Sequence, residues 1–472
     1  MVINLLFFLL FIGLPILGAP LSRYHSLSLS LASASLFFLE ALALIIYNLL
    51  GGHDLHEVSS HFLGLSFKLN RLSLCMLIFV LCLSGMILSY ARRYMTSDSH
   101  QEKFLLRFCL LISSVNFLVL SNNLLTAFIA WQGIGFFIYK LLTHYDQRPK
   151  AIKAANLKCF ITRVGDICFL SAILIAYFTI GTSDYSALAS SHYSLEIAFL
   201  LTIAVMTKSS LYPFHQWLPE TLETPTPVSA VMHAGVINAG GFLLLRNWGL
   251  FSSHPTLLIF LAFIGLWTAF MGALHKQKQF SVKKKLAYST QSQMGFMTFQ
   301  YGIGAPPAAF FHIFAHGLFK ATAFLNSGDF SLSEKIEPIL RDNPLPAFDV
   351  FLGKFFNIFM AVGLSVGSGF LIKQLFGLSL GNPILLSFIE ITMAQLIYQS
   401  LRSESVLLIK LACILFTFIL FTFYNLIIFY WSHYFGPIFY PKIMVPLWLS
   451  IFFILSLWGI EIFFWFFFET KE

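Results

Sequence analysis

Long apolar stretches recur along almost the whole chain, from residue 2 to about residue 468. Crossing the hydrocarbon core of a bilayer takes roughly 20 residues of α-helix, and about 14 or 15 stretches of this chain reach that length. Only 11% of the residues are charged, and 58% are hydrophobic. A transmembrane β-barrel would alternate apolar and polar positions in segments of about ten residues, a pattern that these stretches lack. The sequence therefore predicts an all-α integral membrane protein.

The first apolar stretch, "VINLLFFLLFIGLPILGA", has no basic segment before it, and further apolar stretches follow closely. This arrangement favours a retained transmembrane helix over a cleaved signal peptide. The polar segments are no longer than linkers, so no soluble domain is expected. Residues 1–472 are predicted to form a single polytopic membrane domain.

Basic residues gather in three of the segments that separate the apolar stretches. Each of these segments follows an odd-numbered span, so the positive-inside rule places all three in the cytoplasm and the N-terminus outside. The net charge of +8 therefore indicates membrane topology rather than binding to nucleic acid. The clustered residues are Arg92, Arg93, Lys103 and Arg107; Lys140, Arg148, Lys150, Lys153 and Lys158; and Lys276, Lys278, Lys283, Lys284 and Lys285.

Two apolar stretches combine a lysine with residues that interrupt helices. In "MTKSSLYPFHQWLPETLETPTPVSAVMHAG", Pro213 is expected to break the helix that contains Lys208, and the next helix is expected to begin after "TPTP". In "VGLSVGSGFLIKQLFG", three glycines precede Lys373. Broken helices at membrane depth line cavities or binding sites in transporters. The two stretches lie about five spans apart, which suggests an internal repeat.

Ionisable side chains inside the apolar stretches are the main functional signal, because each costs a few kcal/mol unless it is paired or hydrated. For Glu40, Lys410 and Glu461 an ion pair, a snorkelling side chain or a helix end is a sufficient explanation. The central or clustered residues favour a functional interpretation. The full set is Glu40, Arg163, Asp166, Lys208, His233, His312, His316, Lys320, Lys373, Glu390, Lys410 and Glu461.

The stretch "FHIFAHGLFKATAFL" places His312, His316 and Lys320 at intervals of four residues. An α-helix turns by about 100° and rises by about 1.5 Å per residue, so these side chains should follow one face of the helix. Imidazole donates from one nitrogen and accepts at the other, and a lysine in an apolar environment readily changes its charge. The spacing therefore favours proton transfer.

Other interpretations of the histidines have less support. A zinc site at His312 and His316 would need a third ligand, and haem would need a ligand on another helix. The six cysteines show no Cys-x-x-Cys or Cys/His spacing, which is typical of buried small side chains. The chain carries no Walker loop, dinucleotide fingerprint or nucleophile elbow. We therefore expect ion translocation without covalent chemistry, and no cofactor or metal in this chain.

Four motifs stand out in the sequence: "TRVGD" (162–166), "TKSSLYPFHQWLPETLETPTPVSAVMHAG" (207–235), "VKKKLAYSTQSQMGFM" (282–297) and "HIFAHGLFKATAFLNSGD" (312–329). They resemble those of the antiporter-like proton-conducting subunits shared by respiratory complex I, membrane hydrogenases and Mrp-type sodium/proton antiporters. The resemblance implies about 14 core helices, two inverted five-helix repeats and broken helices 7 and 12 around a polar axis that carries protons. The implied organisation is N-terminal helices in 1–100, a first repeat in 101–250, a second repeat in 251–402 and C-terminal helices in 403–472.

The resemblance also implies a proton pathway through this chain. The family's lysine of helix 7 corresponds to Lys208, and the acid of "TRVGD" to Asp166. The remaining pathway positions correspond to His233 in helix 8, Lys283 with its neighbour Lys284 in helix 10, His312, His316 and Lys320 in helix 11, and Lys373 in helix 12.

One position departs from the family pattern. Respiratory members carry a glutamate in helix 5 that pairs with the lysine of helix 7, whereas "AFIAWQGIGFF" has Gln132 there. A glutamine forms hydrogen bonds but holds no charge. Asp166 or Glu40 could replace the missing carboxylate, and a scaffold whose proton pathway has degenerated is a further possibility.

Within the superfamily, "HAGVINAGGFLLLR" and "AHGLFKATAFLNSGD" are most similar to the DabB family, the membrane subunits of Dab-type complexes that accumulate dissolved inorganic carbon. That family implies a cytoplasmic DabA-like zinc protein as partner, similar to a β-type carbonic anhydrase. Proton influx through the membrane subunit would then drive hydration of CO2 to bicarbonate in the partner. The alternative is a proton- or sodium-translocating subunit of complex I, a membrane hydrogenase or an Mrp antiporter.

Overall fold

The computed structural model describes residues 58–62 and 64–329, with separate residues between 415 and 435. The chain divides into two compact units. The first contains Met1–Gly302 and Ala309–Glu334, and the second contains Ile303–Ala308 and Lys335–Glu472. Nearly all of the described residues belong to the first unit, so the fold and the site are described there.

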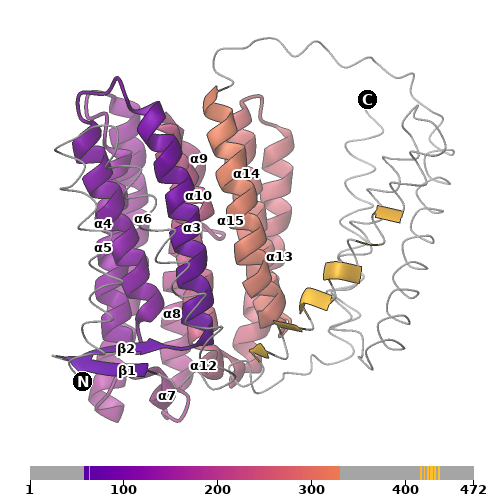
Figure 1. Cartoon of the computed structure of the whole chain (residues 1–472). Helices are drawn as coiled ribbons and strands as arrows, with labels where there is room; N and C mark the ends of the chain where they lie inside the picture. Colours follow the sequence, from indigo (N-terminus) through magenta and orange to yellow (C-terminus); the bar gives the residue numbers. More distant parts are fainter. Residues whose placement is uncertain are drawn as a thin grey trace. The chain divides into compact units, whose positions relative to one another are not determined.

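The described part of the first unit is a bundle of helices with one short β-hairpin (Figure 1). The hairpin and the short helix α7 lie at one end of the bundle, and several of the longer helices run between its two ends. In chain order the elements are β1 (Val58–Phe62), β2 (Leu65–Leu69), α3 (Arg71–Tyr94), α4 (Gln101–Leu120), α5 (Leu124–Leu142), α6 (Pro149–Ile180), α7 (Tyr185–Leu188), α8 (Ser194–Lys208), α9 (Trp217–Glu220), η1 (Thr221–Glu223), α10 (Thr226–Ala234), η2 (Val236–Asn238), α11 (Ala239–Arg246), α12 (Trp248–Ser252), α13 (Pro255–Gln277), α14 (Val282–Gly302) and α15 (Pro306–Asp329).

Seven helical segments in the described residues are long and apolar enough to cross a membrane. They are Arg71–Tyr94, Gln101–Leu120, Leu124–Leu142, Pro149–Ile180, Thr226–Arg246, Pro255–Gln277 and Pro306–Ser327. Helix α8 is too short to be counted alone, and the sequence of α14 is rich in glutamine, serine and threonine. The prediction of a helical membrane protein is confirmed. The predicted break near Lys373 and residues 330–402 of the second repeat lie outside the described residues.

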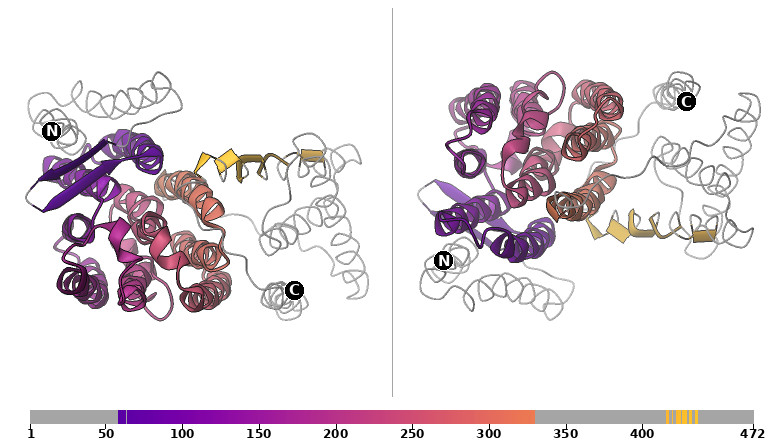
Figure 2. Two further views of the ribbon diagram at one scale, coloured as in Figure 1. Left: turned by 90° about the horizontal axis from the view of Figure 1, so that it is seen from below. Right: turned by 90° about the horizontal axis from the view of Figure 1, so that it is seen from above.

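The β-hairpin was not predicted from the sequence. Strands β1 and β2 pair antiparallel, with Val58 opposite Leu69, around a turn in which Gly64 has a φ of 78°. The backbone N–H of Asn122 donates to the carbonyl of Ser66 at 2.8 Å, which ties the hairpin to the connection between α4 and α5. The hairpin therefore lies across part of one end of the bundle (Figure 2).

Arg246 joins the hairpin to three helices at the same end. Its guanidinium donates to the carbonyls of Lys68 and Ser121 and to the side chains of Asn70 and Ser73, at 2.9–3.2 Å. Asn70 also caps α3 by accepting from the backbone N–H of Ser73. These bonds fix where α3 and α11 meet.

Small residues bring α13 and α14 into close contact. A Cβ on Gly265 would collide with the backbone of Phe299, and one on Gly295 would collide with the backbone of Ala269. Such close approach is typical of helix pairs in membranes, where packing rather than the hydrophobic effect holds helices together.

The predicted break after Lys208 is present. Helix α8 ends at Lys208, and the chain then runs through Ser210, whose φ is 56°, and a cis Tyr212–Pro213 peptide bond to α9. Helix α10 begins at Thr226, inside "TPTP" rather than after it. Proline is tolerated in the first turn of a helix because its missing N–H would have no intrahelical partner there.

Candidate functional site

Lys208 is held at the end of α8, in the interior of the bundle. Only 3% of the residue is exposed. Its ammonium donates to the carbonyl of Trp131 at 3.2 Å and lies 4.4 Å from the centre of the Trp131 ring. The free carbonyls at the C-terminal end of a helix and the face of an indole both favour a cation. The break after α8 therefore creates a site for a buried ammonium group.

Asp166 lies on α6 beside this lysine. Its carboxylate accepts from Trp131 Nε1 and from Arg163 Nη1, both at 3.1 Å. The same Arg163 nitrogen donates to Gln132 Oε1 at 2.9 Å. Gln132 thus contacts Arg163, whereas Trp131 links Asp166 to Lys208. Within the described residues, no carboxylate forms a direct ion pair with Lys208.

Lys158 corrects an interpretation made from the sequence. The sequence assigned it to a cytoplasmic basic loop, but it lies inside α6 and is only 3% exposed. Its ammonium lies 5.5 Å from the centre of the Trp217 ring. Together with Asp166 and Lys208 it lines a cavity of about 10 Å³, roughly the room that one water molecule needs.

The sequence did contain a signal for this residue. Lys158, Thr162 and Asp166 are spaced by four, which places them along one face of a helix. All three line the same cavity. We call Lys158, Arg163, Asp166 and Lys208 the lysine–aspartate cluster.

Close contact between α6 and α8 brings this cluster together. A Cβ on Gly165 would overlap Thr207 Oγ1 and would lie 3.1 Å from the Cα of Ala204. Gly165 precedes Asp166, and Thr207 precedes Lys208. The glycine therefore allows the two charged side chains to approach from separate helices.

A second group of ionisable side chains lies on α15. The ring centres of His312 and His316 are 5.9 Å apart, and Lys320 follows one turn later, completely buried. His312 Nδ1 lies 3.2 Å from Gln300 Oε1, and the ammonium of Lys320 donates to the carbonyl of Leu286 at 3.2 Å. Both partners belong to α14, so α14 and α15 carry this group between them.

His233 reaches the same group from α10. It is completely buried, and its ring stacks on that of Phe324 with the centres 4.3 Å apart. It lies close enough to Lys320 and His316 to interact with both electrostatically. The structure thus brings His233 together with His312, His316 and Lys320, and we call these four residues the histidine–lysine cluster.

The imidazoles of His233 and His316 lack protein partners for hydrogen bonding. All four of their ring nitrogens are buried, and none bonds to another group in the described part of the chain. The same holds for both side-chain polar atoms of Gln291 and for the hydroxyl of Tyr301 on α14. Buried polar groups in folded proteins nearly always have a protein or water partner. The arrangement is therefore suited to water molecules that pass protons between imidazoles.

The remaining predicted pathway residues lie elsewhere. Lys283 and Lys284 occupy the first turn of α14, where Lys283 is half-buried and Lys284 exposed. The structure does not bring either of them into the two clusters. Lys276, at the end of α13, interacts electrostatically with Lys320, a contact that was not expected from the sequence. Lys373 lies outside the described residues.

The described residues contain no group of three His, Cys, Asp or Glu side chains that could hold a metal ion. Five cysteines fall in this part of the chain, and all five are free thiols.

Comparison with known families gives two matches. Residues 121–389 match the family described as NADH:quinone oxidoreductase/Mrp antiporter, TM. Residues 56–105 match the N-terminal region of chain 5 of NADH-ubiquinone oxidoreductase (complex I). The first match contains both clusters.

Individual relatives agree with these families. The chain is 32% identical over 401 residues to the probable inorganic carbon transporter subunit DabB2 of Halothiobacillus neapolitanus, covering 81% of this chain and 72% of DabB2. It is 36% identical to subunit DabB1 of the same organism, over 60% of this chain and 53% of DabB1. It is also 36% identical to chloroplastic NAD(P)H-quinone oxidoreductase subunit 5 of Chara vulgaris, over 60% of this chain and 44% of that subunit. The chain thus spans about half the length of the last two relatives.

Two solved structures have a similar fold. The Mrp complex of Dietzia sp. DQ12-45-1b matches 96% of this chain and 55% of its own, with a TM-score of 0.67 and 22% identity. The membrane-bound sulfane sulfur reductase, an archaeal respiratory complex, matches 96% of this chain and 75% of its own, with a TM-score of 0.60 and 19% identity. The antiporter-like fold and the family resemblance expected from the motifs are confirmed.

Proposed function

The chain belongs to the NADH:quinone oxidoreductase/Mrp antiporter transmembrane family, and we propose that it is the proton-conducting subunit of an inorganic carbon accumulation complex. It is a multi-pass membrane protein. In the proposed complex a cytoplasmic DabA-like zinc protein, similar to carbonic anhydrase, hydrates CO2. Each CO2 and water give one bicarbonate and one proton. The free energy released as protons flow inward through this chain drives the reaction in the direction of hydration. We place the complex in the cell inner membrane, with the N-terminus outside.

One observation carries the proposal: two clusters of buried ionisable groups lie inside a helical membrane bundle. A static structural role would favour full pairing of such groups, because a buried unpaired charge is costly. Lys208 has no direct carboxylate partner within the described residues, and the imidazoles of His233 and His316 have no protein hydrogen bonds there. Groups held in this way can gain and lose protons without breaking a strong ion pair.

The two clusters suit two steps of proton movement. Lys208 and Lys158 share a water-sized cavity with Asp166, so a proton that reaches the cavity can move between an ammonium and a carboxylate. His233, His312 and His316 can then pass a proton onward, since a neutral imidazole accepts at one nitrogen while it donates from the other. Lys320 lies at the end of this series. We propose that Lys283, Lys284 and Lys373 also take part in the proton pathway, as the family resemblance implies.

A second candidate function comes from the relatives named as NAD(P)H-quinone oxidoreductase subunits and from the Mrp-like fold. In that case the chain would be a proton- or sodium-translocating subunit of a respiratory complex or an antiporter. Gln132 argues only weakly against this second candidate. It replaces the helix 5 glutamate typical of respiratory members, but Lys208, the lysine with which that glutamate pairs, is still present.

Purification from native membranes tests the proposal and separates the two candidates. The chain would be tagged, extracted in a mild detergent and purified, and its partners would be identified by mass spectrometry together with a zinc analysis. We expect one large soluble zinc protein. A set of flavin or iron–sulfur subunits, or several small membrane subunits, would instead make the chain part of an ion pump and would contradict the proposal.

A further inference from the structure

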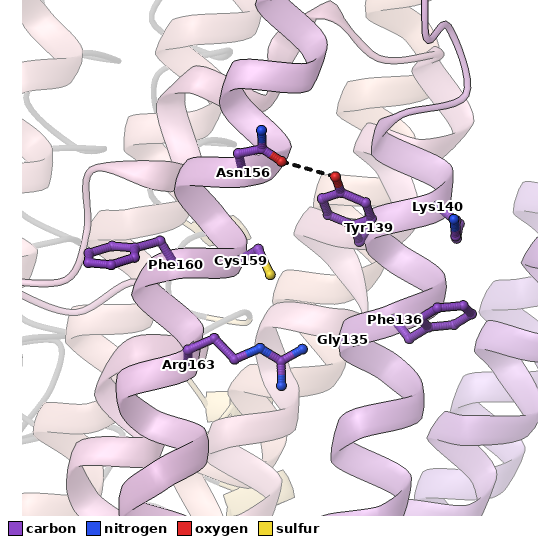
Figure 3. A pocket seen from close by; sticks show the side chains of 8 residues that line it. All are labelled: Gly135, Phe136, Tyr139, Lys140, Asn156, Cys159, Phe160 and Arg163. Carbon is purple, nitrogen blue, oxygen red and sulfur yellow. Dashed lines mark hydrogen bonds between the residues drawn. The ribbon is translucent and has the colours of Figure 1, made fainter.

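A groove of about 510 Å³ runs along the surface between α5 and α6 (Figure 3). Its volume falls in the range of small-molecule sites, roughly 300–1,000 Å³. Four of its lining residues come from each helix. They are Gly135, Phe136, Tyr139, Lys140, Asn156, Cys159, Phe160 and Arg163.

The lining combines positive charge with exposed aromatic rings. Lys140 and Arg163 are cations, and none of the eight lining residues is acidic. Phe136 and Phe160 are 54% and 74% exposed. Tyr139 donates to Asn156 Oδ1 at 3.0 Å (Figure 3). The groove therefore fits a ligand that carries both a negative group and an apolar part.

The surroundings of the groove indicate where that ligand comes from. Helix α6 continues from the groove with an exposed apolar face that includes Ile167 and Phe178, as expected of a surface in contact with lipid. Lys140 lies in the last turn of α5, next to the loop that joins the two helices. The groove thus extends from the end of a membrane span toward its apolar part, the depth at which a phospholipid headgroup meets its acyl chains.

Arg163 is free to bind an anion without losing its contacts. Its bonds to Asp166 and Gln132 both use Nη1. Nη2 and Nε form no hydrogen bond with other described residues, and 58% of the side chain is exposed. The guanidinium lies between α5 and α6 and borders the groove (Figure 3). The donors of a guanidinium fit a phosphate group well.

We propose that this groove binds an anionic phospholipid of the bilayer. Lys140 and Arg163 take the charged headgroup and the phosphate, and the acyl chains run beyond Arg163 along the exposed apolar face of α6 that includes Ile167 and Phe178. Because Arg163 belongs to the lysine–aspartate cluster and also donates to Asp166 and Gln132, the bound lipid holds Arg163 in place within that cluster. This inference does not depend on the nature of the transported ion or of the partner protein.

Native mass spectrometry of the purified full-length chain tests this site. The chain would be delipidated, mixed with phosphatidylglycerol and phosphatidylcholine in equal amounts, and the retained lipid measured. We expect preferential retention of phosphatidylglycerol. Lys140→Gln and Arg163→Gln should each weaken retention about fivefold, the loss that corresponds to about 1 kcal/mol per cation at a membrane surface. Lys153→Gln is the matched control, because Lys153 is an exposed lysine of α6 outside the groove.

The native Cys159 localises the lipid. In nanodiscs, N-ethylmaleimide labelling of Cys159 should be slower with phosphatidylglycerol present than with phosphatidylcholine alone, while labelling of Cys168 stays constant. Lys140→Gln, a change in the last turn of α5, should also remove the difference, so the test holds even if Arg163→Gln fails to fold. Equal retention of both lipids, loss of retention in Lys153→Gln, or unchanged labelling of Cys159 would overturn the proposal. A partner protein crosslinked to Cys159 in the native complex would overturn it as well.

Discussion

The lysine–aspartate cluster and the histidine–lysine cluster accommodate ionisable groups in different ways. In the first, Asp166 accepts two hydrogen bonds and shares a water-sized cavity with two lysines. In the second, the described residues provide no carboxylate among the groups that interact with His316. Its imidazole nitrogens also lack protein partners there. The lysine–aspartate cluster can therefore hold a charge at a moderate cost in free energy, whereas the histidine–lysine cluster is suited to transferring protons.

The difference assigns distinct roles within one pathway. A lysine near a carboxylate has a stable charged state, so it can store a proton. Imidazoles without fixed partners are free to change which nitrogen carries the proton. Loss of a charge-storing group and loss of a relay group should therefore have different effects on stability even when both stop proton movement.

The largest expected effect is that of Lys208→Arg. Arginine keeps the positive charge but does not release its proton in proteins, so the variant separates charge storage from charge switching. We expect near-complete loss of growth at ambient CO2 in the native host, as in Lys208→Ala. Lys153→Arg is the control, and expression is checked by immunoblot. Normal growth of Lys208→Arg would show that Lys208 acts only as a fixed charge.

Gly165→Ala tests whether the lysine–aspartate cluster depends on close contact between α6 and α8. The added methyl group overlaps Thr207, so the helices must separate, at a cost of about 1–3 kcal/mol. Gly135→Ala on α5 is a matched control, because a Cβ there meets no atom within 4 Å. Thermal unfolding in detergent should show a lower Tm for Gly165→Ala alone. Equal Tm values would mean that the contact is not needed to bring the cluster together.

A histidine with a carboxylate partner extends the comparison outside the membrane. His144 Nε2 donates to Asp98 Oδ2 at 3.2 Å, between the loops that follow α3 and α5. Burial lowers the pKa of His144 below 6.5 in spite of Asp98. Burial tends to raise the pKa of Asp98, but hydrogen bonds from His100 and His144 outweigh it, and that pKa is lowered from 3.8.

Both pKa shifts predict that the folded state becomes less stable as the pH falls. Below pH 6.5 the unfolded chain binds a proton at His144 more readily than the folded chain does, and below pH 3.8 the same becomes true of Asp98. Stability should first decrease as the pH falls below 6.5, by at most about 1.4 kcal/mol per pH unit. His144→Gln should flatten this part of the Tm profile, whereas His100→Gln, at an exposed histidine, should not. A His144→Gln profile that matches the wild type would remove His144 from the explanation.

The smallest expected change in stability is that of His316→Leu. If the imidazole were dry, removal of its unpaired nitrogens would stabilise the fold by about 1–3 kcal/mol. Our account places water at this histidine, so we expect a change within roughly 0.5 kcal/mol, together with loss of proton transport. The change in Tm distinguishes the two cases. A clear gain in Tm would argue against a hydrated relay.

The sequence predicted those parts of the site that depend on a single helix. The spacing of four between His312, His316 and Lys320 follows from helix geometry, and Pro213 gave the break after Lys208. Lys158 was assigned to a loop because a lysine next to a basic segment is usually solvated. Its spacing from Asp166 places the two residues on one helix face only if both belong to the same helix, which requires that α6 begins as early as Pro149.

Contacts between helices could not be predicted in this way. The bonds of Trp131 to Lys208 and Asp166 depend on the register of α5 against α6 and α8, which one sequence does not specify. The β-hairpin was missed because two strands of five residues give a weak periodic signal beside long apolar helices.

Proton uptake by the purified complex in liposomes tests the central claim most directly. A pH gradient is imposed, and internal pH and bicarbonate formation are recorded together for the wild type, Lys208→Arg and His316→Leu. We predict that the gradient drives both proton uptake and CO2 hydration in the wild type, and that both are lost in each variant and on addition of a protonophore. Hydration that continues unchanged without a gradient, or proton uptake that persists in both variants, would contradict the account.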